Sequence, residues 1–194
     1  MRVLLVALLL LATHAFAADD TEGYENFDSD TGLYFHPISV EVKGGQGSFC
    51  FSCDAADHDV IVNLFVYDPA KKTGRNLFSR PPGEIRSLII ESEYDAKERK
   101  MVFLGDGRVK NNKNIRPRKP SDQILIESYA CSDEKNCRYT LWKAGKMGGE
   151  PKVLFAFSQS EAESIEWHLD VKNRVVRLLT RTQTGYAVRE FDWQ

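Results

Sequence analysis

Residues 94–104 read YDAKERKMVFL, and residues 169–179 repeat the pattern as LDVKNRVVRLL. Each copy contains the polar motif Asp-x-Lys-x-Arg, followed by a run of apolar and β-branched residues. Such runs form strands when turn-forming residues bound them. The two copies therefore predict two β-hairpins, placed 75 residues apart in the chain.

The repeat extends upstream of this motif. Residues 75–78 match residues 152–155, and two further matches place residues 49–53 and 63–68 over residues 125–129 and 139–144. Four matches in the same order favour a tandem duplication, and convergent hairpin patterning is the alternative. We expect repeat units at about residues 48–104 and 124–180, with a basic insertion at residues 105–122.

Short strand-like runs continue through the rest of the chain, separated by Gly- and Pro-containing turns. No segment carries an amphipathic helical stripe of three turns, so the pattern predicts a single all-β domain over residues 34–194. The expected strands include Ile38–Val42, Val60–Tyr67, Ser87–Ser92, Met101–Leu104, Ile124–Tyr129, Arg138–Trp142, Val153–Phe157, Val175–Thr180 and Tyr186–Phe191.

The last repeat carries a family resemblance. Residues 164–170 (SIEWHLD), 174–179 (RVVRLL) and 186–192 (YAVREFD) resemble a blade of the TolB/WD40-like β-propellers, and the likeness extends over about Val60–Trp193. Val171 stands where such blades carry a turn Gly. A closed propeller needs about four blades, and these strands make about three. The resemblance therefore implies an open or partial propeller, and a two-sheet β-sandwich is the alternative.

The N-terminus has the features of a secretory signal. A basic residue, Arg2, precedes the apolar run Val3–Ala12 and the small residues of Ala15-Phe16-Ala17. We expect cleavage near Ala17, so that residues 1–17 are a signal peptide and the protein is periplasmic or secreted. The absence of Asn-x-Ser/Thr favours a bacterial periplasm. Residues 18–33 are acidic and are expected to be poorly ordered.

Four cysteines in an exported chain predict disulfides. Cys131 and Cys137 flank a polar turn between two expected strands, so a bridge there would clamp a hairpin. Cys50 and Cys53 form a C-x-x-C, for which a structural disulfide is favoured over a redox site because the neighbouring Asp residues would raise a thiol pKa. In an extended strand the two residues would lie about 10 Å apart, too far for a bridge.

The formal net charge is −2, which argues against nucleic acid as a partner. One segment is nonetheless basic and also contains two Pro and three Asn, which favour an irregular conformation outside the core. Its composition predicts a surface for an acidic protein or an anionic envelope component, and a solvated insertion is the alternative. The candidate partner-binding residues are Arg108, Lys110, Lys113, Arg116, Arg118 and Lys119.

Motifs for catalysis, metals and cofactors do not stand out, and no membrane span is expected. The histidines are scattered, and residues 28–32 and 54–59 hold too few carboxylates for calcium. The sequence therefore predicts a non-catalytic binding protein without metal or cofactor. A thiol–disulfide oxidoreductase using Cys50 and Cys53, or a periplasmic inhibitor or immunity protein, is the alternative. Self-association could complete a partial propeller.

Overall fold

A computed structural model describes residues 27–42, 58–105, 107–132, 136–158, 164–182 and 185–193. Its strands form three open sheets, named here A, B and C. Sheet A has the order β1-β2-β3-β4, with bounds Phe27–Asp28, Leu33–Val42, His58–Asp68 and Thr73–Asn76. Sheet B has the order β10-β9-β8-β5-β6, with bounds Lys152–Ser158, Cys137–Gly145, Gln123–Cys131, Glu84–Asp95 and Lys100–Gly105. Sheet C has the order β13-β12-β11-β7, with bounds Gly185–Asp192, Val175–Thr182, Ser164–Asp170 and Val109–Lys110.

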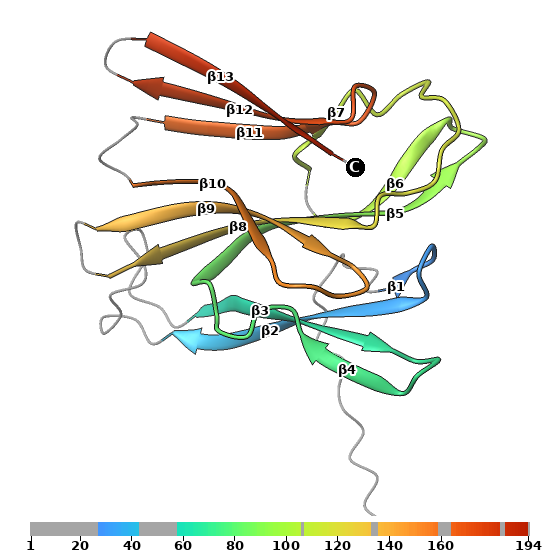
Figure 1. Cartoon of the computed structure of the whole chain (residues 1–194), viewed down its shortest axis with the longest axis horizontal. Helices are drawn as coiled ribbons and strands as arrows, with labels where there is room; N and C mark the ends of the chain where they lie inside the picture. The colour runs from blue at the N-terminus through green and yellow to red at the C-terminus, as the bar shows by residue number, and fades with distance from the viewer. Residues whose placement is uncertain are drawn as a thin grey trace, which may run out of the picture.

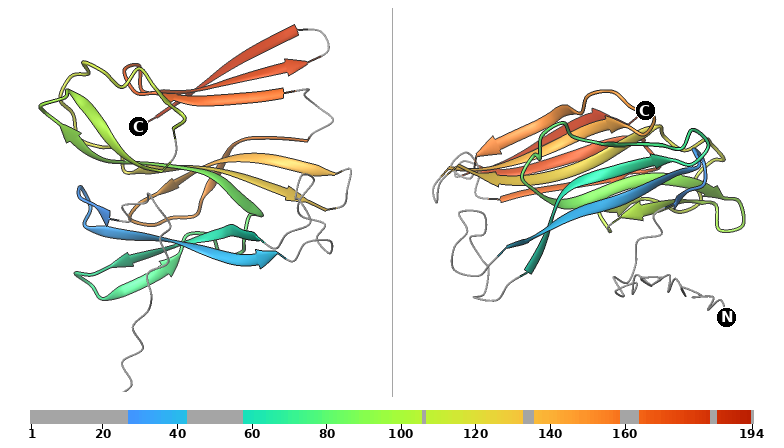
Figure 2. Two further views of the ribbon diagram at one scale, coloured as in Figure 1. Left: turned by 180° about the vertical axis from the view of Figure 1, so that it is seen from behind. Right: turned by 90° about the horizontal axis from the view of Figure 1, so that it is seen from below.

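The three sheets stack as layers, with sheet B in the middle (Figures 1 and 2). One hydrophobic core lies between sheets A and B and contains Phe35, Leu64 and Ile126. A second core lies between sheets B and C and contains Leu125 and Trp167. Ile126 and Leu125 are neighbours on β8 that point to opposite faces of the sheet, so sheet B is packed on both sides.

This double burial explains the sequence of the central strands. In β8, residues 124–129 are all buried, and residues 124–126 read Ile-Leu-Ile without a polar interruption. The neighbouring strand β5 likewise contains Leu88-Ile89-Ile90. A strand covered on one face alternates apolar and polar residues, whereas one covered on both faces shows a continuous apolar run. The middle layer could thus be recognised from its apolar runs.

The all-β prediction is confirmed, and all nine expected strand runs lie within observed strands. The expectation that residues 18–33 are poorly ordered is wrong for residues 27–33. Phe27 and Asp28 form β1, which pairs with β2, and Asp28 is fully buried. Its burial depends on an ion pair with the distant Lys146, which the acidic local sequence does not reveal.

Three of the four matches in the internal repeat take corresponding places in successive sheets, and residues 49–53 of the fourth lie outside the described residues. In sheet A, β3 lies beside β4, just as β9 lies beside β10 in sheet B. The hairpin β5-β6 then belongs to sheet B, and its match β11-β12 belongs to sheet C. Each half of the chain therefore starts in one sheet and ends in the next.

The repeated Asp motif forms the tight turn of its hairpin. Asp95 Oδ1 accepts hydrogen bonds from the backbone N–H groups of Lys97 and Glu98 at 2.9 and 3.0 Å. Asp170 Oδ1 likewise accepts one from the N–H of Asn173 at 3.1 Å. The fourth residue after each Asp, Arg99 or Arg174, has a positive φ of 52° or 56°. The element that the two copies of the repeat share is thus a turn built around an Asp side chain.

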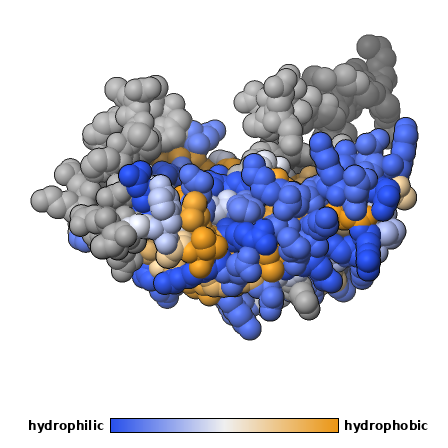
Figure 3. Space-filling model, turned by 90° about the horizontal axis from the view of Figure 1, so that it is seen from above, coloured by the Kyte–Doolittle hydropathy of each residue, from blue (hydrophilic) through white to orange (hydrophobic). Residues whose placement is uncertain are grey.

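The surface seen from above, where sheet C lies in Figure 1, is mostly hydrophilic with a small hydrophobic patch (Figure 3). Among the exposed large apolar side chains are Tyr186 and Val188 of the edge strand β13, which are 68% and 63% exposed. Scattered apolar side chains of this kind are ordinary on a protein surface. In the described part of the chain, no helix has the length and apolarity needed to span a membrane.

Buried charges join the layers at one end of the stack. Lys146, in the turn after β9, is fully buried and pairs with Asp28 of sheet A at 2.9 Å. Its Nζ also donates to the backbone carbonyl of Glu91 in sheet B at 2.5 Å. The Glu91 carboxylate, itself fully buried, accepts from Trp193 Nε1 at 3.0 Å and from two nitrogens of Arg118 at 2.5 and 2.6 Å. Trp193 follows β13, so the network reaches all three sheets.

Replacing Arg118 with Met should lower the free energy of unfolding by about 3–5 kcal/mol, because it leaves the buried Glu91 carboxylate without its cation. Urea unfolding followed by circular dichroism measures the change. Lys119→Met is the matched control, since Lys119 is exposed, and it should alter stability by less than about 0.5 kcal/mol. Equal effects of the two variants would contradict the assigned role of Arg118.

Candidate functional site

The basic segment, residues 107–122, lies between β6 and β8 of sheet B and contributes β7 to sheet C. Gly105 ends β6 with a φ of 108°, and a Cβ there would lie 1.7 Å from the carbonyl oxygen of Leu88. Only glycine fits this close approach of two backbones. The segment then forms β7, which pairs in parallel with the end of β11 and covers that edge of sheet C.

Hydrogen bonds to the backbone of the β5-β6 hairpin hold the middle of the segment in place. The Asn112 side chain accepts from the N–H of Met101 at 2.8 Å and donates to its carbonyl at 2.7 Å. Ile115 is 4% exposed and belongs to the core between sheets B and C. Its N–H donates to the carbonyl of Arg99 at 3.0 Å. Apart from β7 the segment is irregular, as predicted. The expectation that it stays outside the core is wrong, because Ile115 is buried there and the Asn112 side chain holds the segment against β6.

Two of the six candidate cations point inward. Arg118 binds the buried Glu91, and its side chain is only 15% exposed. Arg108 pairs with Glu127 at 3.0 Å and lies over the ring of Trp167 at 5.1 Å. Both guanidinium groups are engaged in contacts that hold the segment against the sheets. Arg108 and Arg118 are therefore positioning residues of the segment.

The other four cations face solvent. Lys110, Lys113, Arg116 and Lys119 are all exposed. None of the described acidic side chains lies within ion-pair distance of them. Anchors at Asn112, Ile115 and Arg118 alternate with these cations along the chain. The result is a group of exposed positive charges on a fixed backbone, which we call the basic surface.

Asp170 ties the start of the basic surface to the hairpin of sheet C. Its carboxylate, fully buried, accepts from the side chains of Asn111 at 2.8 Å and Asn173 at 2.9 Å and pairs with Arg177. Burial by itself would raise the pKa of Asp170, but the hydrogen bonds from Asn173, Asn111 and Arg177 lower it to about 2. The charged form is thus the one that the fold stabilises.

The depressed pKa of Asp170 makes stability depend on pH. Its contribution is fully present above the ordinary value of 3.8 and is lost as pH falls toward about 2. We expect Asp170→Asn to be more destabilising at pH 7 than at pH 2, by about 2 kcal/mol. Urea unfolding of wild type and variant across this range measures the difference. Asp59→Asn, at an exposed position, is the control, and a difference that does not vary with pH would contradict the assignment.

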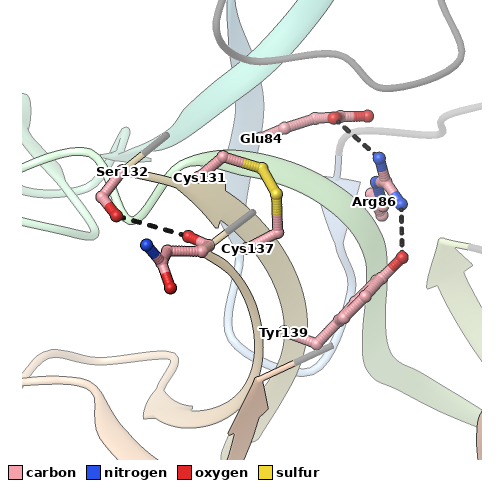
Figure 4. Close-up of a disulfide and its surroundings, with 7 residues drawn as sticks. Glu84, Arg86, Cys131, Ser132, Cys137 and Tyr139 are labelled. Atoms are coloured by element: carbon pink, nitrogen blue, oxygen red, sulfur yellow. Dashed lines mark hydrogen bonds and ion pairs between the residues drawn. A yellow bond between two sulfur atoms is a disulfide. The ribbon is translucent and has the colours of Figure 1, made fainter. Parts of the chain in front are cut away.

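The Cys131–Cys137 disulfide is present, as the sequence predicts, with a Cα–Cα distance of 4.0 Å. It joins the ends of β8 and β9, where the two cysteines are directly paired in the sheet. Figure 4 shows it beside Arg86, which pairs with Glu84 at 3.2 Å and donates to the Tyr139 hydroxyl at 3.1 Å. The bridge therefore clamps a hairpin of the central sheet. Cys50 and Cys53 lie outside the described residues.

The double substitution of Cys131 and Cys137 by Ser should lower the free energy of unfolding by about 2 kcal/mol. The bridge adds only modestly to the free energy of unfolding, because it closes a short loop and so removes little conformational entropy from the unfolded chain. Thermal or urea unfolding without reducing agent measures the loss. An unchanged midpoint would contradict a stabilising role for the bridge.

Three important residues gave no signal in the sequence. Glu91, Lys146 and Trp193 lie far apart in the chain and in no recognisable motif, yet they meet in one buried network.

The described residues contain no group of three or more His, Cys, Asp or Glu placed to hold a metal. What the geometry brings together is a fixed basic surface.

Comparison of the chain with protein-family models, with curated proteins and with solved structures finds no match.

Proposed function

We propose that this protein is an exported, non-catalytic binding protein whose basic surface contacts an acidic protein or an anionic envelope component. The observation that carries the proposal is the alternation of buried anchors and free cations in residues 107–122. Ile115 is buried in the core and Arg118 is paired with the buried Glu91, while Lys110, Lys113 and Arg116 stay exposed.

A fixed backbone favours binding because the segment loses little conformational entropy when a partner arrives. The four cations also lie on a protein with a net charge of −2, so they form a local positive field against an acidic background. Such a field speeds encounter with an acidic partner and orients it. Both features support a contact surface over a merely solvated insertion.

The proposed location is the bacterial periplasm, after cleavage near Ala17, and it rests on the leader sequence. The proposed architecture is an open propeller whose blades are sheets A, B and C, with each repeat unit shared between two neighbouring blades. A layered β-sandwich accounts equally well for the three open sheets. In either case the basic surface extends the edge of sheet C through β7.

The proposal is tested by removing the four exposed charges without touching the anchors. A variant with Gln at positions 110, 113, 116 and 119 should fold as wild type does, because these side chains are exposed. We expect its affinity for polyglutamate, and for vesicles with anionic head groups, to fall about tenfold at low salt. Surface plasmon resonance measures both arms, and a preference for one arm distinguishes a protein-like partner from a lipid surface.

The matched control carries Gln at Lys71, Lys72, Arg80 and Lys152, which are also exposed cations. It changes the net charge by the same amount but leaves the basic surface intact. Wild-type-like binding by this control, together with loss in the test variant, would support the proposal. Equal losses in both variants would show that only net charge matters and would contradict a specific surface.

A further inference from the structure

An apolar cleft of about 700 Å³ opens between sheets A and B, at the end of the stack away from the buried charges. Its sheet A wall contains Val40 and Val60, which are paired across β2 and β3. Its sheet B wall contains Trp142, Val153 and Ala156. The volume lies in the range of ligand pockets, about 300–1,000 Å³. Val40 and Val153 are 45% and 51% exposed, so the cleft leaves apolar surface in contact with water.

The interior of this cleft offers few polar partners. The Trp142 indole N–H is already bonded to the Ser128 hydroxyl at 2.8 Å. Glu84, at the margin, is paired with Arg86 at 3.2 Å. A polar ligand atom deep in the cleft would therefore lose its hydrogen bonds to water without replacement, which costs about 1–3 kcal/mol per group.

Arg138 places one positive charge on the cleft wall. It is exposed, and none of the described acidic side chains pairs with it. The nearest acidic pair on sheet A, Glu41 and Asp59, are direct partners in the register. They alternate with the cleft-lining Val40 and Val60 and so point to the opposite face of that sheet. The described part of the cleft is therefore apolar inside and positively charged at Arg138.

We propose that this cleft binds a single acyl chain that ends in an anionic group, with the chain between the valines and the anion on Arg138. The Arg guanidinium matches a carboxylate or a phosphate through paired N–H donors. The hydrocarbon chain packs against the apolar walls and carries no polar atom that would need a hydrogen-bond partner. This site is separate from the basic surface and does not depend on it.

An acyl chain fits the cleft better than a peptide does. Each peptide residue carries an N–H and a C=O that must be hydrogen-bonded when buried. The valine, proline and alanine side chains of the walls supply no such bonds, and Thr140 offers a single hydroxyl. The interior thus favours a ligand whose only polar group is at one end.

The test measures binding of the mature chain to alkyl carboxylates of 8, 10 and 12 carbons by isothermal titration calorimetry, below their micellar concentrations. Burial of each added methylene is worth about 0.8 kcal/mol, so Kd should tighten about fourfold per carbon until the cleft is full. Dodecyl phosphate should bind like dodecanoate, because the Arg138 guanidinium matches either anion. Dodecyltrimethylammonium, with a positive head group, should bind at least tenfold more weakly.

Arg138→Gln should weaken dodecanoate binding about tenfold and abolish the preference over the cationic amphiphile. Lys152→Gln, which removes an exposed cation outside the cleft, is the control and should bind as wild type does. Ala156→Trp should block the cleft. Val153→Glu provides a second test at an exposed site, where folding tolerates the change, and should also repel the anion.

Three results would overturn the proposal. The first is that none of the alkyl ligands binds saturably. The second is that the affinity does not depend on the length of the alkyl chain. The third is that Arg138→Gln and wild type bind dodecanoate equally well. If no alkyl ligand binds and sedimentation shows that the protein is a dimer, a second copy of the protein would be identified as the occupant of the cleft. Binding of an apolar peptide in place of the alkyl series would identify a protein ligand.

Discussion

The Glu91 carboxylate is a fully buried charge within the layers, and their arrangement depends on satisfying it. A buried carboxylate is very unfavourable without cations and donors. Here Arg118, Ser121 and Trp193 supply the donors, and the backbone of Glu91 accepts from Lys146. Lys146 in turn neutralises Asp28. One chain of contacts thus connects β1, β5, the basic segment and Trp193, which follows β13.

This network explains why a segment of polar and charged composition has a fixed structure. A run rich in Lys, Arg, Asn and Pro buries little apolar surface and would ordinarily remain mobile. Arg118 reaches a carboxylate that is already buried, and the Asn112 side chain bonds the backbone of Met101 at the open edge of β6. Ile115 adds an apolar anchor. The remaining cations are consequently held outward at fixed positions, as a binding surface requires.

The two ends of the stack differ in how the space between the sheets is filled. At one end, charges and the C-terminal Trp193 close the space between the sheets. At the other end, sheets A and B leave a cleft with apolar walls and Arg138. The β8-β9 hairpin borders that cleft, and the Cys131–Cys137 bridge holds its two strands in register. The proposed basic surface and the proposed cleft site therefore share no residues.

Local patterns in the sequence were enough to predict the strands, the hairpin disulfide and the turns of the Asp motif, because each depends on residues close together in the chain. The continuous apolar runs of β5 and β8 also indicate strands buried on both faces. The pairing of Asp28 with Lys146 and of Glu91 with Arg118 was decided only by the tertiary structure. An isolated acidic or basic residue reads as surface charge in a sequence, and it becomes buried only when folding brings an opposite charge to it. The same physical reason separates Arg118, which anchors the basic segment, from its neighbour Lys119, which remains exposed.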